Sequence, residues 1–317
     1  MHIQEEFLYK TDCLIKEKLS QKCPEDFLDA AYLKLQKVSR YSVLVNNAKR
    51  IRPFLCCAYQ HLFINHNEEK IISIAAAAEL IHCASLLHDD VVDNSDKRRG
   101  QASANHLYGN NVSILTGNYL LAIAFEILIS LDKKIMDQAI YTVKQMSLGC
   151  MMEISSRGNL NSTKEHWQQI ALKKTASLFS WCGFSVAFLL GTDKDINSLF
   201  QLSNHIGLAF QMNDDIKDLS TTTKSYCNDL KNKELSLPII LSIQKNSNSY
   251  NSFKELFSKQ ELSLSDIETL KNIVIKNNII EDINNLLREE LLLIKKILTN
   301  YSNSLGEKYI NSIMDNW

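Results

Sequence analysis

Glycine and proline are scarce in this chain of 317 residues, which contains nine glycines and three prolines. An all-β fold needs many tight turns, and such turns depend on these two residues, so their scarcity argues against that architecture. An excess of one charge is also absent, because 35 Lys and Arg residues face 36 Asp and Glu residues, for a net charge of -1. Nothing in this balance indicates nucleic acid as a partner.

Cysteine pairs with metal-site spacing are absent, because none of the eight cysteines belongs to a CxxC motif. The N-terminus has neither the positive region nor the apolar region of a secretory signal. No run of about 20 uninterrupted apolar residues is present, so we expect no transmembrane helix. These absences predict a cytoplasmic protein with reduced thiols.

The chain is predicted to be helical almost throughout, because apolar residues recur every three or four positions. The expected helices cover residues 3–20, 26–45, 53–66, 68–93, 111–131, 133–157, 164–190, 196–219, 238–245, 263–275 and 277–300. The Asn/Ser-rich stretch 246–252 is expected to be a solvent loop. Capping boxes are expected at Ser162 with Glu165 and at Ser265 with Glu268.

Some of these helices are apolar on more than one face, residues 68–88 and 176–190 among them, as is typical of the interior of a large bundle. No heptad run and no linker divides the chain. The sequence therefore predicts an all-α fold with one domain over residues 1–317, a single bundle of roughly ten or more antiparallel helices around a central cavity.

Two aspartate clusters of the same form, residues 89–93 (DDVVD) and 214–218 (DDIKD), end two of the apolar helical stretches. Helical residues four apart share a face, with Cβ atoms about 5–6 Å apart. Like charges on one face destabilise a helix unless a cation lies between them. Mg²⁺ binds carboxylates together with substrate phosphates, so the clusters predict a cleft with two rows of magnesium ligands.

Basic residues lie near the first cluster in the sequence, at 49–52 and at 97–99, and His82 precedes Asp89 by two turns on the same helix face. Such basic groups commonly form exposed salt bridges of little energetic value. They can also bind one diphosphate directly while Mg²⁺ bridges another to the carboxylates. The repetition of the aspartate motif favours this second interpretation.

In their order and separation, the motifs resemble the trans-type isoprenyl (polyprenyl) diphosphate synthases, most of all the medium- and long-chain, octaprenyl-type members. The resemblance covers nearly the whole chain. It rests on residues 79–93, 97–100, 174–176, 210–218 and 228–238. It implies a prenyltransferase that joins an allylic diphosphate to isopentenyl diphosphate, using about two or three Mg²⁺ ions.

The resemblance also implies roles for individual residues. The catalytic residues would be Asp89, Asp90, Asp93, Asp214, Asp215 and Lys174. Mg²⁺ would be held by Asp89, Asp93, Asp214 and Asp218, with Asp90 and Asp215 in support. The allylic diphosphate would be contacted by Arg98, Lys174, Thr175, Gln211, Lys224 and Lys233. The isopentenyl diphosphate would be held by Lys49, Arg52, His82 and Arg99.

Product length is expected to depend on the helix before the first aspartate cluster, where the growing chain would run past Ala78, Ile81, Ala84 and Ser85. In the family that the chain resembles, bulky aromatic residues just before this cluster go with short products. Ala84 and Ser85 are small. They predict a product longer than farnesyl diphosphate, although small residues also serve close helix packing.

The chain departs from the family pattern at four places. It has Ala48 and Cys227 where glycine is usual, Asn118 after Gly117 where aspartate is usual, and Glu153 where glutamine is common. Glycine lets the backbone approach a ligand closely, so its loss could weaken diphosphate binding. No charged group of the predicted site is lost, and we expect activity.

Four other interpretations can be compared with these residues. A class I terpene synthase would share the first aspartate motif but not the second-diphosphate group. A catalytic subunit of a heterodimeric synthase would have the same site residues, whereas a non-catalytic subunit would be expected to lose the aspartates. A di-iron protein would need Glu-x-x-His pairs on its helices, and none is placed to serve. The family resemblance favours a homodimer, with peripheral membrane contact for product release.

Overall fold

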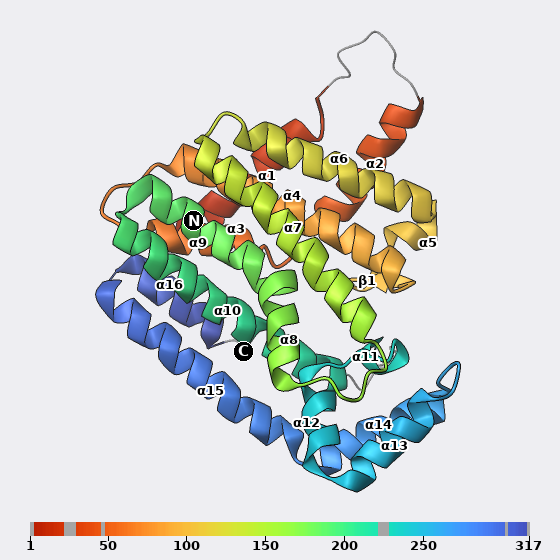
Figure 1. Cartoon of the computed structure of the whole chain (residues 1–317). Coiled ribbons are helices and arrows are strands. Elements are labelled where there is room, and N and C mark those ends of the chain that lie inside the picture. Colours follow the sequence, from red (N-terminus) through yellow and green to blue (C-terminus); the bar gives the residue numbers. More distant parts are fainter. Residues whose placement is uncertain (1–2, 22–29, 46–47, 221–227, 302–303, 316–317) are drawn as a thin grey trace. The chain divides into compact units, whose positions relative to one another are not determined.

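The computed structural model describes residues 3–21, 30–45, 48–220, 228–301 and 304–315, which are helical almost throughout (Figure 1). Within these residues, the single sheet is an antiparallel pair of two-residue strands, β1 (Lys97–Arg98) and β2 (Gln101–Ala102). The predicted all-α fold is confirmed. The chain divides into two compact units that share several helices.

Unit 1 contains Met1–Ile140, Trp181–Leu199 and Asn303–Asn311. Its complete helices are α1 (Ile3–Lys18), α2 (Ala30–Val43), α3 (Ile51–Gln60), α4 (Glu68–Val92), α5 (Ala104–Tyr108) and α6 (Asn110–Leu128). Helix α4 packs against α1, α2, α3 and α6, and it is the core helix of this unit (Figure 1).

Unit 2 contains Tyr141–Ser180, Phe200–Ser302 and Ser312–Trp317. Its complete helices are α8 (Lys164–Ala171), a π-helical segment (Leu172–Ala176), α11 (Asn228–Lys231), α12 (Leu237–Lys245), α13 (Ser247–Phe257), α14 (Leu264–Lys276), α15 (Ile279–Leu298) and a 3₁₀ turn (Thr299–Tyr301). Helix α12 packs against α8, α13, α14 and α15.

Four helices contribute residues to both units, namely α7 (Lys133–Ser156), α9 (Ser177–Leu190), α10 (Asp193–Ser220) and α16 (Leu305–Met314).

Helix α4 begins with favourable N-terminal chemistry. The side chain of Asn67 accepts a hydrogen bond from the backbone N–H of Lys70 at 3.4 Å. Glu68 and Glu69 place negative charge at the positive end of the helix dipole. The helix interior is alanine-rich and fully buried at residues 75–78, so neighbouring helices can approach it closely. The predicted helix 68–93 is therefore correct to within one residue.

The prediction of a loop at 246–252 is wrong, because α13 begins at Ser247. Asn246 caps this helix by accepting a hydrogen bond from the backbone N–H of Ser249 at 2.8 Å, and Phe253 and Phe257 bury its apolar face. Asn and Ser are good capping residues, and here they signal the start of a helix.

Both predicted capping boxes are wrong, each by one or two positions. Thr163, and not Ser162, caps α8 by accepting from the backbone N–H of His166 at 3.2 Å. A complete box does form before α14, between Ser263 and Asp266. Both Asp266 and Glu268 follow a serine by three residues and suit the third helical position, so the sequence pattern alone did not fix where α14 begins.

Other boundaries differ from the predictions. The expected helix 53–66 ends at Gln60, and the expected helix 164–190 is interrupted by the π-helical segment. The turn after the first aspartate cluster contains the β1–β2 hairpin. Three short helices, α5, α11 and α16, were not predicted.

Two of the described helices, α4 and α6, are long and apolar enough to cross a membrane by length and composition alone. Within the most apolar stretch of each, 67% and 44% of the residues are buried inside the structure. The burial of α4 is that of a core helix.

Candidate active site

The first aspartate cluster lies at the C-terminal end of α4. Asp89 occupies the last turns of the helix, and Asp93 is its C-cap, with its backbone N–H bonded to the carbonyl of Asp89 at 2.9 Å. Both side chains are partly exposed, whereas Asp90 is only 3% exposed. The helix therefore presents Asp89 and Asp93 at its surface and turns Asp90 inward.

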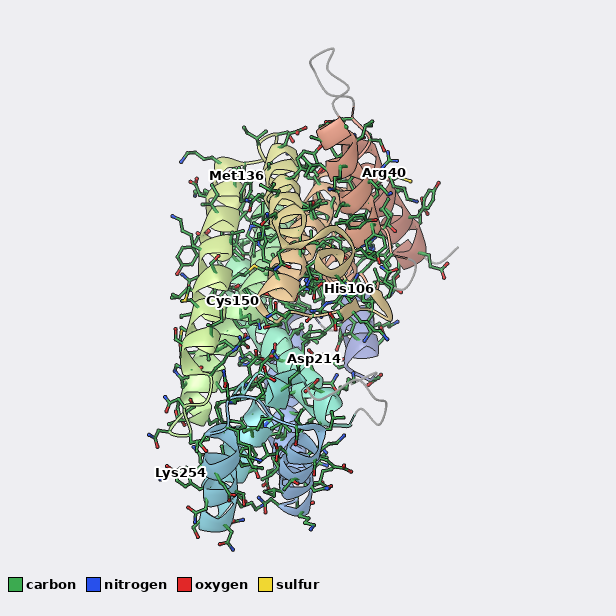
Figure 2. The ribbon with its side chains drawn as sticks, turned by 90° about the vertical axis from the view of Figure 1, so that its right-hand side faces the viewer. Arg40, His106, Met136, Cys150, Asp214 and Lys254 are labelled. Carbon is green, nitrogen blue, oxygen red and sulfur yellow. The ribbon has the colours of Figure 1, made fainter. Side chains whose placement is uncertain are left out.

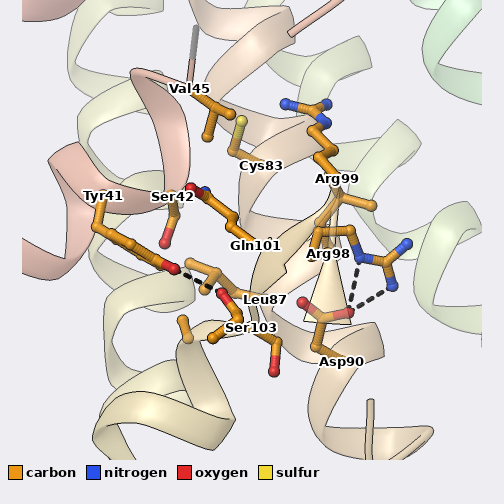
Figure 3. Close-up of a pocket in the computed structure, with 13 residues that line it drawn as sticks. Tyr41, Ser42, Val45, Cys83, Leu87, Asp90, Arg98, Arg99, Gln101 and Ser103 are labelled. Carbon is orange, nitrogen blue, oxygen red and sulfur yellow. Dashed lines mark hydrogen bonds and ion pairs between the residues drawn. The ribbon is translucent and has the colours of Figure 1, made fainter. Parts of the chain in front are cut away.

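Asp90 is bound to Arg98 of the β1–β2 hairpin (Figure 3). The Nε of Arg98 donates to the carboxylate at 2.8 Å, and Nη2 donates to the same oxygen. Burial raises the pKa of Asp90, and the Arg98 pair partly offsets that rise. Asp90 and Arg98 thus form an ion pair, which the sequence did not predict.

A small, open hollow lies between α2, α4 and the hairpin (Figure 3). Tyr41 closes one side by donating to the carbonyl of Ala102 at 2.6 Å. Cys83 and Leu87 line this hollow from α4. It therefore lies on a face of α4 different from the one that carries Ser85 and Asp89.

His88 packs in the other direction, against α6. Its Nε2 lies 3.2 Å from the carbonyl of Ile114, and a Cβ on Gly117 would come within 2.3 Å of that nitrogen. The glycine at 117 thus makes room for the ring next to Asp89. His88 thus packs against α6 and points away from the hairpin side of α4.

Three of the predicted isopentenyl diphosphate contacts, Arg52, His82 and Arg99, lie close together in unit 1. Nη2 of Arg99 is 3.4 Å from Nε2 of His82. Burial, followed by the charge of Arg52, lowers the pKa of His82 well below its usual 6.5. The imidazole is therefore neutral near pH 7, and the positive charge of the group comes from its arginines. Lys49, the fourth predicted contact, is exposed beside Arg50.

Arg50 forms a buried ion pair with Glu79 of α4, at 2.6 Å between Nη1 and Oε1. The sequence analysis gave neither residue a role. Glu79 and His82 have the Glu-x-x-His spacing of some metal sites, but the structure pairs Glu79 with an arginine. A single Glu inside the apolar, alanine-rich run of α4 was the signal that could have identified it.

The second aspartate cluster lies in unit 2, near the C-terminal end of α10. Asp214 is exposed (Figure 2), Asp218 is partly exposed and Asp215 is buried. The alternation follows from the helical period, as it does at the first cluster.

Asp215 joins three helices of unit 2. Its carboxylate accepts from Trp167 Nε1 of α8 at 3.0 Å, from the backbone N–H of Leu237 of α12 at 3.0 Å and from Gln211 Nε2 at 2.8 Å. Burial raises the pKa of Asp215 to about 7, against the opposing effect of these donors. Asp215 therefore links α8, α10 and α12 through its hydrogen bonds.

Lys174 and Thr175 lie on the π-helical segment. A Cβ on Gly149 of α7 would come within 2.4 Å of the backbone N of Lys174, and one on Gly207 of α10 within 2.5 Å of Cα of Ala176. Two helix glycines thus make room for the widened turn. π-Helical turns occur frequently at functional sites, and the sequence analysis missed this one.

The side chains of this segment are held by unit 2 residues. Lys174 donates to the carboxylate of Glu153, so the Glu that departs from the family pattern balances this lysine. Thr175 donates to Gln211 at 2.6 Å, and Gln211 donates to Asp215. The structure therefore brings together the predicted contacts Lys174, Thr175 and Gln211 with the second aspartate cluster.

Lys233 has a different environment from the one expected of a diphosphate contact. Its ammonium donates to the backbone carbonyls of Phe257 at 3.0 Å, Gln260 at 3.4 Å and Lys259. It thus caps the C-terminal end of α13, where the helix dipole favours positive charge. Lys224 and Cys227 lie outside the described residues, so the diphosphate contact at Lys224 and the effect of the missing glycine at Cys227 stay predictions.

Asp229 is a residue that the sequence analysis did not select. Burial raises its pKa well above 3.8, and the nearby charges of Asp218 and Asp215 act in the same direction. It belongs to the stretch 228–238 that carried the resemblance. Its acidic neighbourhood in unit 2 appears only in the folded chain.

The carboxylates fit Mg²⁺ in chemical type. Among the residues that the structure describes, no group of three or more His, Cys, Asp or Glu side chains is assembled for a metal. Mg²⁺ usually binds through one or two carboxylates together with waters and substrate phosphates, so it needs no such cage. Asp89 with Asp93, and Asp214 with Asp218, are the accessible oxygen pairs that suit this mode.

The four predicted product-length residues occupy α4 before the first cluster. Ala78 and Ala84 are fully buried, and Ile81 is nearly so. Ser85 is partly exposed, and its hydroxyl donates to the carbonyl of His82 at 2.8 Å. Of the four, Ser85 is the position that can accept a larger side chain at the least packing cost.

The sequence profile of the family described as Polyprenyl synthetase matches residues 34–274. A geranylgeranyl diphosphate synthase of Cyanophora paradoxa is 32% identical over 256 residues, which cover 75% of this chain and 83% of that protein. The octaprenyl diphosphate synthase of Escherichia coli K12 is 31% identical over 206 residues, which cover 63% of this chain and 64% of that protein.

Solved structures agree in fold. The decaprenyl diphosphate synthase of Rhodobacter capsulatus has a TM-score of 0.89 at 24% identity, with 98% of this chain and 95% of that chain covered. A polyprenyl synthase of Caulobacter crescentus, in complex with calcium and isoprenyl diphosphate, has a TM-score of 0.88 at 24% identity, with 98% and 94% covered.

The helical fold and the profile match define the protein as a prenyltransferase of the isoprenoid synthase type. The chain belongs to the polyprenyl synthetase family. The predicted family and fold are thereby confirmed.

Proposed function

We propose that this chain condenses an allylic diphosphate with isopentenyl diphosphate, head to tail and in the trans configuration, to a polyprenyl diphosphate longer than farnesyl diphosphate. The observation that carries the proposal is the composition of unit 1. It combines a partly exposed carboxylate pair, Asp89 and Asp93, with the basic group of Arg52, His82 and Arg99. The carboxylates suit a metal-bound diphosphate, and the basic group suits a second one bound directly.

The reaction begins with the break of the allylic C–O bond. The proposed ligands of Mg²⁺ are Asp89 and Asp93 in unit 1 and Asp214 and Asp218 in unit 2, and the bound ion would supply the charge neutralisation that the leaving diphosphate needs. Lys174, Thr175 and Gln211 would add hydrogen bonds to the same group. Asp90, which is paired with Arg98, and Asp215, which accepts three hydrogen bonds, would support the clusters from within.

The allylic cation then needs surroundings without water. The apolar stretch of α4 before Asp89 supplies such a wall. The double bond of isopentenyl diphosphate attacks the cation and forms the new C–C bond. A proton is then lost to the departing diphosphate, so the reaction requires no protein base.

The basic group would hold isopentenyl diphosphate while this bond forms. With His82 neutral, Arg52, Arg99 and Lys49 carry the positive charge, and the imidazole adds a hydrogen bond. An arginine fork binds a diphosphate through two oxygens at once, which fixes orientation as well as affinity.

A homodimer is the assembly that we propose, with a cytoplasmic location and peripheral membrane contact during product release. A heterodimeric synthase is the second candidate. An Arabidopsis thaliana protein named as the large subunit of a heterodimeric geranylgeranyl pyrophosphate synthase is 34% identical over 234 residues, which cover 62% of that protein.

The function is tested by incubating the purified chain with Mg²⁺, radiolabelled isopentenyl diphosphate and an allylic primer, either geranyl or farnesyl diphosphate, and then sizing the extracted products. We expect prenyl diphosphates longer than farnesyl diphosphate, and loss of product when Mg²⁺ is chelated. Asp89→Asn should abolish product formation, whereas Asp96→Asn, an exposed aspartate just beyond the cluster, should not. Absence of product with every primer would overturn the proposal for the isolated chain.

A further inference from the structure

Glu79 is a buried carboxylate, 1% exposed, in the middle of the apolar stretch of α4. It precedes His82 by less than one helical turn, and Cys83 Sγ lies 3.8 Å from its Oε1. A buried carboxylate is costly unless it is paired, so its presence requires a compensating cation. The condensation chemistry described above makes no use of this residue.

The compensating cation is Arg50, whose backbone is strained. Its backbone φ of 48° lies in the left-handed region, which residues other than glycine rarely adopt. Such a conformation persists only when the surroundings hold it. Arg50 immediately precedes α3 and has Lys49 as its neighbour on the other side.

Groups from three helices hold the Arg50 guanidinium. Besides Glu79 of α4, it donates to the carbonyl of Val43 of α2 at 2.8 Å, and it forms an ion pair with Asp12 of α1 at 3.0 Å. The planar fork of arginine suits these fixed directions, whereas lysine could not satisfy all of them. The side chain therefore determines the path of the backbone that presents Lys49 and Arg52.

Glu79 also acts on the charge of the basic group. Arg52 is 7% exposed, and burial lowers its pKa while the charge of Glu79 raises it. Arg52, Arg99 and Arg50 all lie close enough to influence His82. Glu79 thus offsets part of the mutual repulsion of these arginines before an anion binds.

We propose that Glu79 and Arg50 form a positioning pair that sets Lys49, Arg52 and His82 for the diphosphate of isopentenyl diphosphate. The inference rests on the proposed function. Glu79 joins the strained backbone at Arg50 to the helix that carries His82, so one ion pair aligns both parts of the group. The pair contacts neither substrate.

Steady-state kinetics of Glu79→Gln test the proposal, because this change removes the charge and keeps the shape. We expect KM for isopentenyl diphosphate to rise about tenfold or more, with kcat and KM for the allylic diphosphate within about twofold of wild type. Arg50→Lys should change the same KM in the same direction. Glu69→Gln, an exposed position on the same helix, is the matched control and should keep the wild-type kcat and KM values.

A merely structural pair would lower Tm without this selectivity. Equal rises in both KM values, or a lower Tm with both KM values unchanged, would overturn the proposal. Calorimetric titration with isopentenyl diphosphate alone separates this result from a failure of the proposed function. If wild type binds the ligand but makes no product, the proposed function fails, and about tenfold weaker binding by Glu79→Gln would still support the pair.

Discussion

At the scale of single residues, each aspartate cluster contains two kinds of carboxylate. Asp89 is partly exposed and Asp214 is exposed, whereas Asp90 and Asp215 are buried and accept hydrogen bonds from Arg98 and from Trp167. The one-letter pattern DD makes neighbours look equivalent, but the helical period turns consecutive side chains about 100° apart. Substitutions within a cluster should therefore differ in kind, with losses of chemistry at one position and losses of stability at the next.

Product length can be tested at Ser85. Ser85→Phe should shorten the main product, because an aromatic ring on this partly exposed face would obstruct the path of the growing chain. Chromatography of the labelled products measures the change. Ala84→Phe is the less informative variant, because Ala84 is fully buried and a larger side chain there would strain the core by about 1–3 kcal/mol. An unchanged distribution of products from Ser85→Phe would contradict the hypothesis.

The neutral state of His82 predicts a dependence of stability on pH. Its pKa in the folded chain lies well below 6.5, because burial and the nearby arginines disfavour the charged ring. As the pH falls below about 6.5, the unfolded chain gains a proton that the folded chain does not, so the free energy of unfolding decreases. Urea denaturation should show a smaller decrease for His82→Gln than for wild type between about pH 7 and pH 5.

The control for this prediction is the interval above about pH 7.5, where the unfolded histidine is also neutral. There, the difference in unfolding free energy between His82→Gln and wild type should stay constant. Parallel curves through the acidic interval would contradict the neutral assignment.

At the scale of elements, the π-helical segment shows how packing creates an irregular turn. Lys174 and Thr175 stand where α8 widens before α9 begins, and Gly149 and Gly207 provide the space on the neighbouring helices. If either glycine were replaced, the Cβ of the new residue would clash with the backbone of the segment. The irregular turn thus depends on three separate stretches of sequence.

Gly207→Ala tests this dependence. The new Cβ would lie 2.5 Å from Cα of Ala176, so the π-helical segment would have to shift. We expect a loss of about 1–3 kcal/mol in unfolding free energy and a higher KM for the allylic diphosphate, because Lys174 and Thr175 move with the segment. Denaturant unfolding and steady-state kinetics measure the two effects.

Ser147→Ala is the matched control, because Ser147 is an exposed position on α7, the helix that carries Gly149. It should leave both quantities unchanged. Wild-type kinetics in Gly207→Ala would show that the position of the segment is not needed for the allylic substrate.

At the scale of the whole molecule, the proposed homodimer can be examined at the exposed apolar side chains of unit 1. Leu107 of α5 and Leu115 of α6 are 49% and 59% exposed, and Ile114 is 40% exposed. Helices α5 and α6 pack against each other. Exposed apolar groups on adjoining elements are typical of protein–protein contacts.

We expect light scattering after gel filtration to give about twice the chain mass of 36.2 kDa. Leu115→Arg should reduce the mass toward that of one chain, because a buried charge in a contact is costly. Lys144→Glu, an exposed and already polar position, serves as the control. A single-chain mass for wild type would contradict the homodimer and favour the heterodimeric alternative.

The sequence by itself determined the helical class and the family, and it paired the aspartates of each cluster on one helix face. Local periodicity and local motifs carry that information, because the helical period places Asp89 with Asp93 and Asp214 with Asp218 without any tertiary contact. The start of α4 was predictable for the same reason, because its capping residue and acidic first turn are local in the sequence.

Tertiary structure alone decided the partners of the buried groups. Arg50 meets Glu79, Arg98 meets Asp90, and Lys233 meets the end of α13 only after distant segments pack together. The sequence around a lysine does not tell whether its ammonium caps a helix, as that of Lys233 does, or binds a diphosphate. The physical reason is that a buried charge selects its partner by three-dimensional proximity, whereas a helical face is set by the spacing of residues along the chain.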